Sequence, residues 1–219
     1  MKSKFLVTVL VIFIFSKVVN AQLLSSFGMK IGVANAGQSW DYSGDLTTIE
    51  IFDKSRIGFA FGVYTEWFDL PLISIIAEAH YIQKGSKGEI IVATMDSPAG
   101  TGETKTITPR IDYLSMPLLA KLRYETNSFT VYGIAGPRID ILIGKNSEAV
   151  GSVFDDFKYT DIGGTFGFGF EIPITEIYFA SCELRYSPSF QNIFSNGILE
   201  VKNRSLEFLV VFGHKLHTR

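Results

Sequence analysis

The chain has 219 residues, of which 47% are hydrophobic and 19% are charged, and its formal net charge is −2. This balance gives no support to nucleic-acid binding, which depends on a strongly basic surface. The single cysteine, Cys182, cannot form an internal disulfide, and its neighbours contain no metal-ligand pattern. We therefore expect no disulfide framework, no metal site and no cofactor.

The N-terminus has the three parts of a secretory signal peptide. Lys2 and Lys4 precede an apolar run over residues 5–15, and a small-residue cleavage site ends at Ala21. The run is too short for a membrane helix, which needs about 20 apolar residues. We therefore expect residues 1–21 to be removed on export. Three lysines leave with this segment, so the mature chain carries 17 basic side chains against 22 acidic ones and a net charge of −5.

From residue 22 onward, apolar residues alternate with small or polar ones, which is the period of a β-strand. In segment 56–67, for example, large apolar side chains occupy most odd positions, and glycine, alanine, tyrosine and glutamate occupy most even ones. No stretch in this part reaches the roughly 18 apolar residues of a membrane helix, so any membrane insertion would be by strands. The alternating segments are 26–36, 56–67, 72–84, 110–124, 129–143, 159–172, 176–187 and 203–214.

The connections between these segments alternate in length. Three are tight turns, namely 68–71, 125–128 and 173–175. Four are long and polar, namely 37–55, 85–109, 144–158 and 188–202. Outer-membrane barrels of bacteria have short periplasmic turns and long extracellular loops. The pattern therefore predicts an all-β fold, an eight-stranded antiparallel transmembrane β-barrel over residues 22–219, with both termini on the short-turn side.

The two faces of the predicted strands decide between a membrane barrel and a soluble one, whose apolar face points inward. The polar positions carry charges of both signs, which can pair inside an eight-stranded barrel. Facing lipid, each Arg or Lys would cost about 2–4 kcal/mol near the midplane. We therefore place the polar face inside. The predicted inward residues are Lys30, Glu66, Glu78, His80, Lys121, Arg123, Arg138, Asp140, Asp161, Glu171, Glu183, Arg185 and Glu207.

Aromatic residues of the apolar face lie near the predicted strand ends, as expected where rings meet the membrane interface. They are Trp67, Tyr124, Phe129 and Tyr178 beside the short turns, and Tyr81 and Tyr186 towards the opposite ends. Two prolines, Pro117 and Pro137, fall inside predicted strands, where each removes a backbone donor. We expect a local bulge at each of them.

Three stretches resemble a known family. Residues 113–124 read YLSMPLLAKLRY, residues 131–138 read VYGIAGPR, and residues 27–35 read FGMKIGVAN. These motifs resemble strands of the PorT-like family of outer-membrane β-barrel proteins, and the resemblance spans essentially the mature chain. It implies a barrel scaffold with an accessory role in protein secretion across the outer membrane. The motifs specify no chemistry.

Several functions fit the sequence. The first is a non-enzymatic barrel whose long loops, especially 85–109, or whose periplasmic rim contact a secretion or envelope protein. Such a barrel would have membrane lipid and the barrel-assembly machinery as its other partners. The sequence also fits a small-solute channel through the charged lumen. An interior of eight strands, however, is just wide enough to be filled by side chains.

A further function that fits the sequence is that of a lipid-modifying enzyme, an acyltransferase or deacylase. His80 and Ser115 have the same inward parity on adjacent predicted strands, and Glu78 lies one inward position below. A Ser-His-carboxylate relay needs these groups within hydrogen-bond reach. Because a mixed polar lumen supplies such trios by chance, we predict no catalytic residues.

Overall fold

The computed structural model describes residues 23–42, 54–68, 70–91, 104–126, 128–146, 156–196 and 199–216. The signal peptide predicted over residues 1–21 lies outside the described residues. So do the central parts of three of the four long connections.

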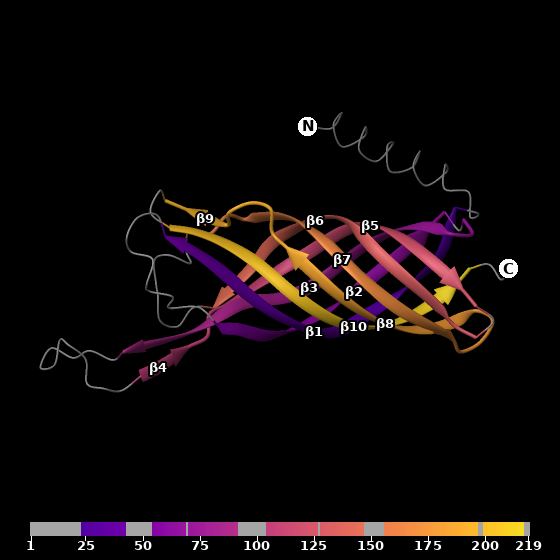
Figure 1. Cartoon of the computed structure of the whole chain (residues 1–219), viewed down its shortest axis with the longest axis horizontal. Helices are drawn as coiled ribbons and strands as arrows, with labels where there is room; N and C mark the ends of the chain where they lie inside the picture. The colour runs from indigo at the N-terminus through magenta and orange to yellow at the C-terminus, as the bar shows by residue number, and fades with distance from the viewer. Residues whose placement is uncertain are drawn as a thin grey trace, which may run out of the picture.

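Eight long antiparallel strands form a closed ring (Figure 1). Around the ring they follow the order β1-β2-β3-β5-β6-β7-β8-β10, and β1 pairs with β10 to close it. Each of the eight predicted segments corresponds to one of these strands, which confirms the predicted strand number and pairing. The long strands are β1 (Leu24–Tyr42), β2 (Lys54–Trp67), β3 (Ile73–Ile91), β5 (Arg110–Glu125), β6 (Thr130–Asn146), β7 (Thr160–Pro173), β8 (Tyr178–Pro188) and β10 (Leu199–Lys215).

Two further strands lie in connections that were expected to be loops. β4 (Thr104–Ile107) pairs with the end of β3, and β9 (Phe194–Ser195) pairs with the start of β10. β3 runs on past its predicted end because Gly85 adopts a φ of 138°, which only glycine adopts freely. A side chain at Gly85 would also collide with the carbonyl of Pro109. The resulting ribbon of β3 and β4 projects from the left-hand end of the ring in Figure 1.

The bulges predicted at the two prolines are wrong. Pro117 pairs with Arg138, and Pro137 pairs with Gly164, in registers that are the same on both sides of each proline. The ladder between β3 and β5 lapses for two residue pairs beside Pro117 and then resumes in the same register. A missing N–H therefore removes a ladder bond here without the extra residue that a bulge inserts.

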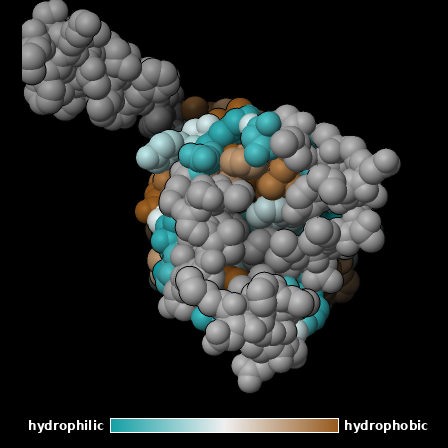
Figure 2. All heavy atoms as spheres, turned by 90° about the vertical axis from the view of Figure 1, so that its left-hand side faces the viewer, coloured by the Kyte–Doolittle hydropathy of each residue, from teal (hydrophilic) through white to brown (hydrophobic). Residues whose placement is uncertain are grey.

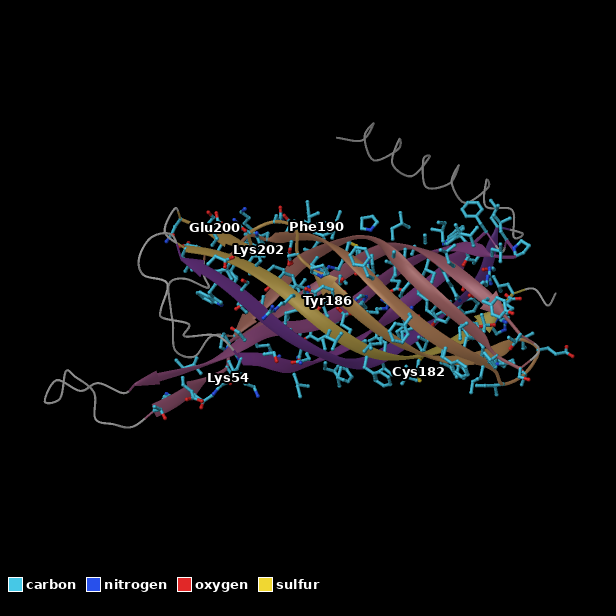
Figure 3. All side chains as sticks on the ribbon, in the orientation of Figure 1. Lys54, Cys182, Tyr186, Phe190, Glu200 and Lys202 are labelled. Carbon is cyan, nitrogen blue, oxygen red and sulfur yellow. The ribbon has the colours of Figure 1, made fainter. Side chains whose placement is uncertain are left out.

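The outer face of the ring is apolar and the inner face is polar, as predicted. On β2, Phe61 is 50% exposed and Val63 is 61% exposed, whereas Ala60 and Glu66 are buried. Twelve of the thirteen predicted inward residues are buried, and the side chain of Arg123 is only 9% exposed. Figure 3 shows the side chains of the outer wall, among them Cys182, which is exposed. This is the arrangement of a barrel whose apolar wall faces lipid.

The core of the ring is built around a central ion cluster, Lys30, Glu78, Glu183 and Arg185. The Nζ atom of Lys30 lies 2.8 Å from Oε1 of Glu78 and 2.9 Å from Oε1 of Glu183. Arg185 donates to Oε2 of Glu78 at 2.8 Å and also pairs with Glu183. Tyr132 donates its hydroxyl to Oε1 of Glu183 at 2.8 Å. Two positive and two negative side chains are thus joined across β1, β3 and β8.

Further ion pairs lie on either side of the central ion cluster. Towards the short turns, Lys121 bridges Glu66 at 3.2 Å and Glu171 at 3.3 Å. Towards the long connections, Lys84 lies 2.6 Å from Asp140. Each of three buried lysines also lies over a tyrosine ring, which stabilises an ammonium group removed from water. The pairs are Lys30 over Tyr64, Lys84 over Tyr113 and Lys121 over Tyr132.

The R185A substitution should strongly destabilise the barrel, because it leaves Lys30 as the main partner of two buried carboxylates. Removing one member of a buried ion pair costs about 3–5 kcal/mol. We expect a loss of this size in the free energy of unfolding, measured by urea titration of the protein in lipid vesicles.

The matched control for R185A is K54A, which removes an ion pair of 2.6 Å with Glu89 whose side chains are 58% and 50% exposed. An exposed pair of this kind contributes about 0–1 kcal/mol. Equal losses for the two variants would contradict the role given to the central ion cluster.

Candidate functional site

The structure brings the three residues of the possible catalytic relay together. His80 on β3 and Ser115 on β5 are directly opposite each other, and Nδ1 of His80 lies 3.8 Å from Oε2 of Glu78. That distance is too long for a hydrogen bond. Within the described chain, Oγ of Ser115 has no hydrogen-bond partner, so nothing links it to His80. Both oxygens of Glu78 accept hydrogen bonds from Arg185, and one also accepts from Lys30. The three residues are neighbours without the bonds of a relay.

The interior around these residues is tightly filled. His80 is 6% exposed and Ser115 is 1% exposed. Between the central ion cluster and the short-turn end, the cavity beside Lys30 and Lys121 measures about 10 Å³. A single water molecule needs about 10–15 Å³. This cavity has room for no more than about one water molecule.

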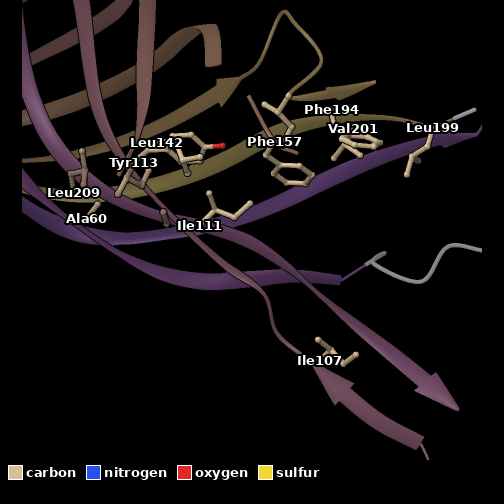
Figure 4. Packing of buried hydrophobic residues seen from close by; sticks show 13 residues of the cluster. Ala60, Ile107, Ile111, Tyr113, Leu142, Phe157, Phe194, Leu199, Val201 and Leu209 are labelled. Carbon is tan, nitrogen blue, oxygen red and sulfur yellow. The ribbon is translucent and has the colours of Figure 1, made fainter. Parts of the chain in front are cut away.

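An apolar cluster lies towards the other end of the interior, and we call it the mouth cluster. It joins residues of β5, β6, β9 and β10 with Phe157 (Figure 4). The rings of Phe157 and Phe194 lie 6.1 Å apart, and the backbone N–H of Ile193 donates to the carbonyl of Val201 at 2.8 Å. Figure 2 looks onto this end and shows hydrophobic residues between hydrophilic ones at its edge. The mouth cluster consists of Ile111, Tyr113, Leu142, Phe157, Ile193, Phe194, Leu199 and Val201.

The ribbon of β3 and β4 leaves the ring beyond the mouth cluster. Its pairing runs from Gly88 opposite Ile107 to Ile91 opposite Thr104. Among the described residues, β3 pairs with β4 alone over this stretch, and β4 pairs with β3 alone. Open strand edges are templates for another strand. The β-branched residues Thr104, Thr106 and Ile107 are the sequence signal that could have revealed β4.

An apolar groove of about 780 Å³ lies on the outer wall, where Gly133 leaves a gap between Leu122 and Phe168. Cys182 lines it (Figure 3). The groove opens away from the interior, so it gives no access to His80 or Ser115.

Neither a membrane helix nor a metal cluster is found in the described chain. No helix there is long and apolar enough to span a membrane. No group of three or more His, Cys, Asp or Glu side chains within the described ranges is placed to hold a metal ion.

Comparison with solved structures agrees with the fold. OprG of Pseudomonas aeruginosa, an outer membrane protein, is 15% identical and has a TM-score of 0.51, with 90% of this chain and 98% of that chain covered. Outer membrane protein W of E. coli is 13% identical with a TM-score of 0.45, and the alignment covers 88% and 98% of the two chains. At these identities the likeness concerns the fold alone. No match to a curated protein was found.

A family model describes the chain more directly. The model of the outer membrane protein beta-barrel domain matches residues 20–195, which is most of the sequence. Together with the closed ring and its apolar outer wall, this match places the protein in the outer membrane. The chain belongs to the family of outer membrane proteins with this β-barrel domain.

Proposed function

We propose that this protein is a non-enzymatic scaffold of the outer membrane that contacts a partner protein through the ribbon of β3 and β4. The ribbon projects from the rim, and among the described residues no third strand pairs with it. Adding a strand to an open edge gives affinity through main-chain hydrogen bonds, a common mode of protein recognition. The cleaved signal peptide over residues 1–21 and insertion by the barrel-assembly machinery belong to the same proposal.

The state of the interior supports a scaffold over a channel or an enzyme. Several of its charges are paired, such as Lys30 with Glu78 and Glu183, and its cavity beside Lys30 is no larger than a water molecule. The mouth cluster lies towards the end nearer the long connections. A scaffold of this kind acts at its rim.

The identity of the partner rests on the sequence resemblance. Residues 113–124 and 131–138 resemble the PorT-like family, which favours an accessory role in protein secretion. This role is an analogy at the level of the scaffold.

Crosslinking at the ribbon tests the partner proposal. A photoreactive amino acid in place of Thr104, which is exposed on β4, should trap a protein in intact membranes. The same group in place of Phe208, on the outer wall, should trap lipid. Mass spectrometry of the adducts identifies the partner. Protein adducts at Thr175 in a short turn, with none at Thr104, would place the contact at the opposite rim and refute the proposal.

Replacing the possible relay tests the non-enzymatic part. The H80A and S115A substitutions together should leave outer-membrane lipids unchanged, because Glu78 is already bound to Lys30 and Arg185. Lipid mass spectrometry of cells with and without the variant is the measurement. A lipid species that disappears with the double variant, while the barrel still folds, would show that the protein is an enzyme.

A further inference from the structure

A polar pocket lies at the base of the ribbon, away from the central ion cluster and from His80 and Ser115. Its volume is about 340 Å³, at the small end of the range typical of ligand sites. Three basic residues line it, namely Arg56 on β2, Lys105 on β4 and Arg110 on β5. Thr106, Thr108 and Asn146 add side-chain donors. We call it the basic pocket.

Asp112 is an acidic neighbour of both arginines of the basic pocket. Arg56 and Arg110 are close enough for their guanidinium groups to repel each other. The acidic partner of Arg110 among the described residues is Asp112, whose Oδ1 lies 3.2 Å from Nε. The contact between Arg110 and Asp112 lacks hydrogen-bond geometry. Nε of Arg110 and Nη1 of Arg56 are both buried atoms without a hydrogen-bond partner in the described chain. Buried donors of this kind indicate that a ligand or ordered water completes the site.

Further charged residues lie beside the basic pocket. Lys54 lies opposite Lys87 at the start of the ribbon, and Figure 3 shows Lys54 at the ribbon's base. Lys54 is neutralised by an ion pair with Glu89 across the ribbon. The positive charge of the pocket therefore comes from Arg56, Lys105 and Arg110. A concentration of one sign raises the local concentration of counter-ions.

The position of the basic pocket relative to the apolar outer wall indicates which anions can reach it. Arg56 lies one residue beyond Ile57, the outermost large apolar residue on the outer face of β2. The pocket is therefore level with the edge of the apolar wall, where hydrocarbon gives way to headgroups. The planar guanidinium group of arginine binds two phosphate oxygens at once through two parallel hydrogen bonds.

We propose that the basic pocket binds a phosphate-bearing ligand through Arg56, Lys105 and Arg110. The phosphate is carried either by the headgroup of a membrane glycolipid or by a free molecule. The pocket exceeds the size of one phosphate group, so the adjoining sugar or other polar group lies against Thr106, Thr108 and Asn146. This site does not depend on the partner proposal, because that proposal concerns the backbone edges of the ribbon.

Binding by the full-length protein in phosphate-free maltoside detergent tests the site. The probes are lipid A, dephosphorylated lipid A and inorganic phosphate, followed by calorimetry and native mass spectrometry. We expect lipid A to bind more tightly than its dephosphorylated form. The R56Q and R110Q substitutions together should weaken binding by at least about tenfold, since hydrogen bonds to charged groups contribute the most. Binding of inorganic phosphate with the same dependence on Arg56 and Arg110 would identify a free phosphate as the ligand.

The matched control removes a basic residue from the same rim, through K202Q on β10. β10 pairs with none of the strands that line the basic pocket, and Figure 3 shows Lys202 away from Lys54. This control should change binding less than about twofold, because distant surface charges are screened by salt. Heat-modifiable gel migration confirms that each variant is folded. If the double arginine variant does not fold, K105E on the exposed ribbon takes its place, with the same expected loss. Equal binding by pocket and control variants, or no preference for the phosphorylated lipid, would overturn the proposal.

Discussion

Inside the ring, Lys30, Glu78, Glu183 and Arg185 bring two positive and two negative side chains within hydrogen-bond distance of one another. Burying an unpaired charge carries a large free-energy cost, and removing one member of a buried ion pair leaves its partner unpaired. The strands must therefore hold these residues in one register, since a shift by one position would turn every charge towards the lipid. The apolar wall outside and the paired charges inside are two consequences of the same alternation.

This constraint also determines where activity can reside. Glu78 is held by Lys30 and Arg185, and no hydrogen bond joins His80 to Ser115 in the described chain. This is why we propose that recognition takes place at the rim. There the described chain has the ribbon of β3 and β4 and, at its base, Arg56 and Arg110. Both features lie beyond the apolar wall, where water and headgroups can reach them.

Much of the fold follows from the two-residue alternation of apolar and polar side chains along the strands. Strand number, strand pairing and the inward position of residues such as Arg138 and Asp161 could be predicted, because each depends on local alternation. The ribbon could not, since Gly85 reads as the start of a loop and its φ of 138° depends on the nearby Pro109. The mouth cluster joins residues far apart in the sequence, such as Phe157 and Phe194, and no short pattern encodes such contacts. The expected bulges failed because a proline can leave one ladder bond unmade and keep the register.

We propose that paired side chains in the interior leave no continuous path through the barrel. Electrical conductance across a planar lipid bilayer is the decisive measurement, with insertion verified by protease protection of the reconstituted protein. We expect no resolvable conductance steps for the wild-type chain, because an interior of eight strands is just wide enough to be filled by side chains. Reproducible steps carried by the inserted wild-type protein would contradict it, since ions could then cross between charges that we describe as paired.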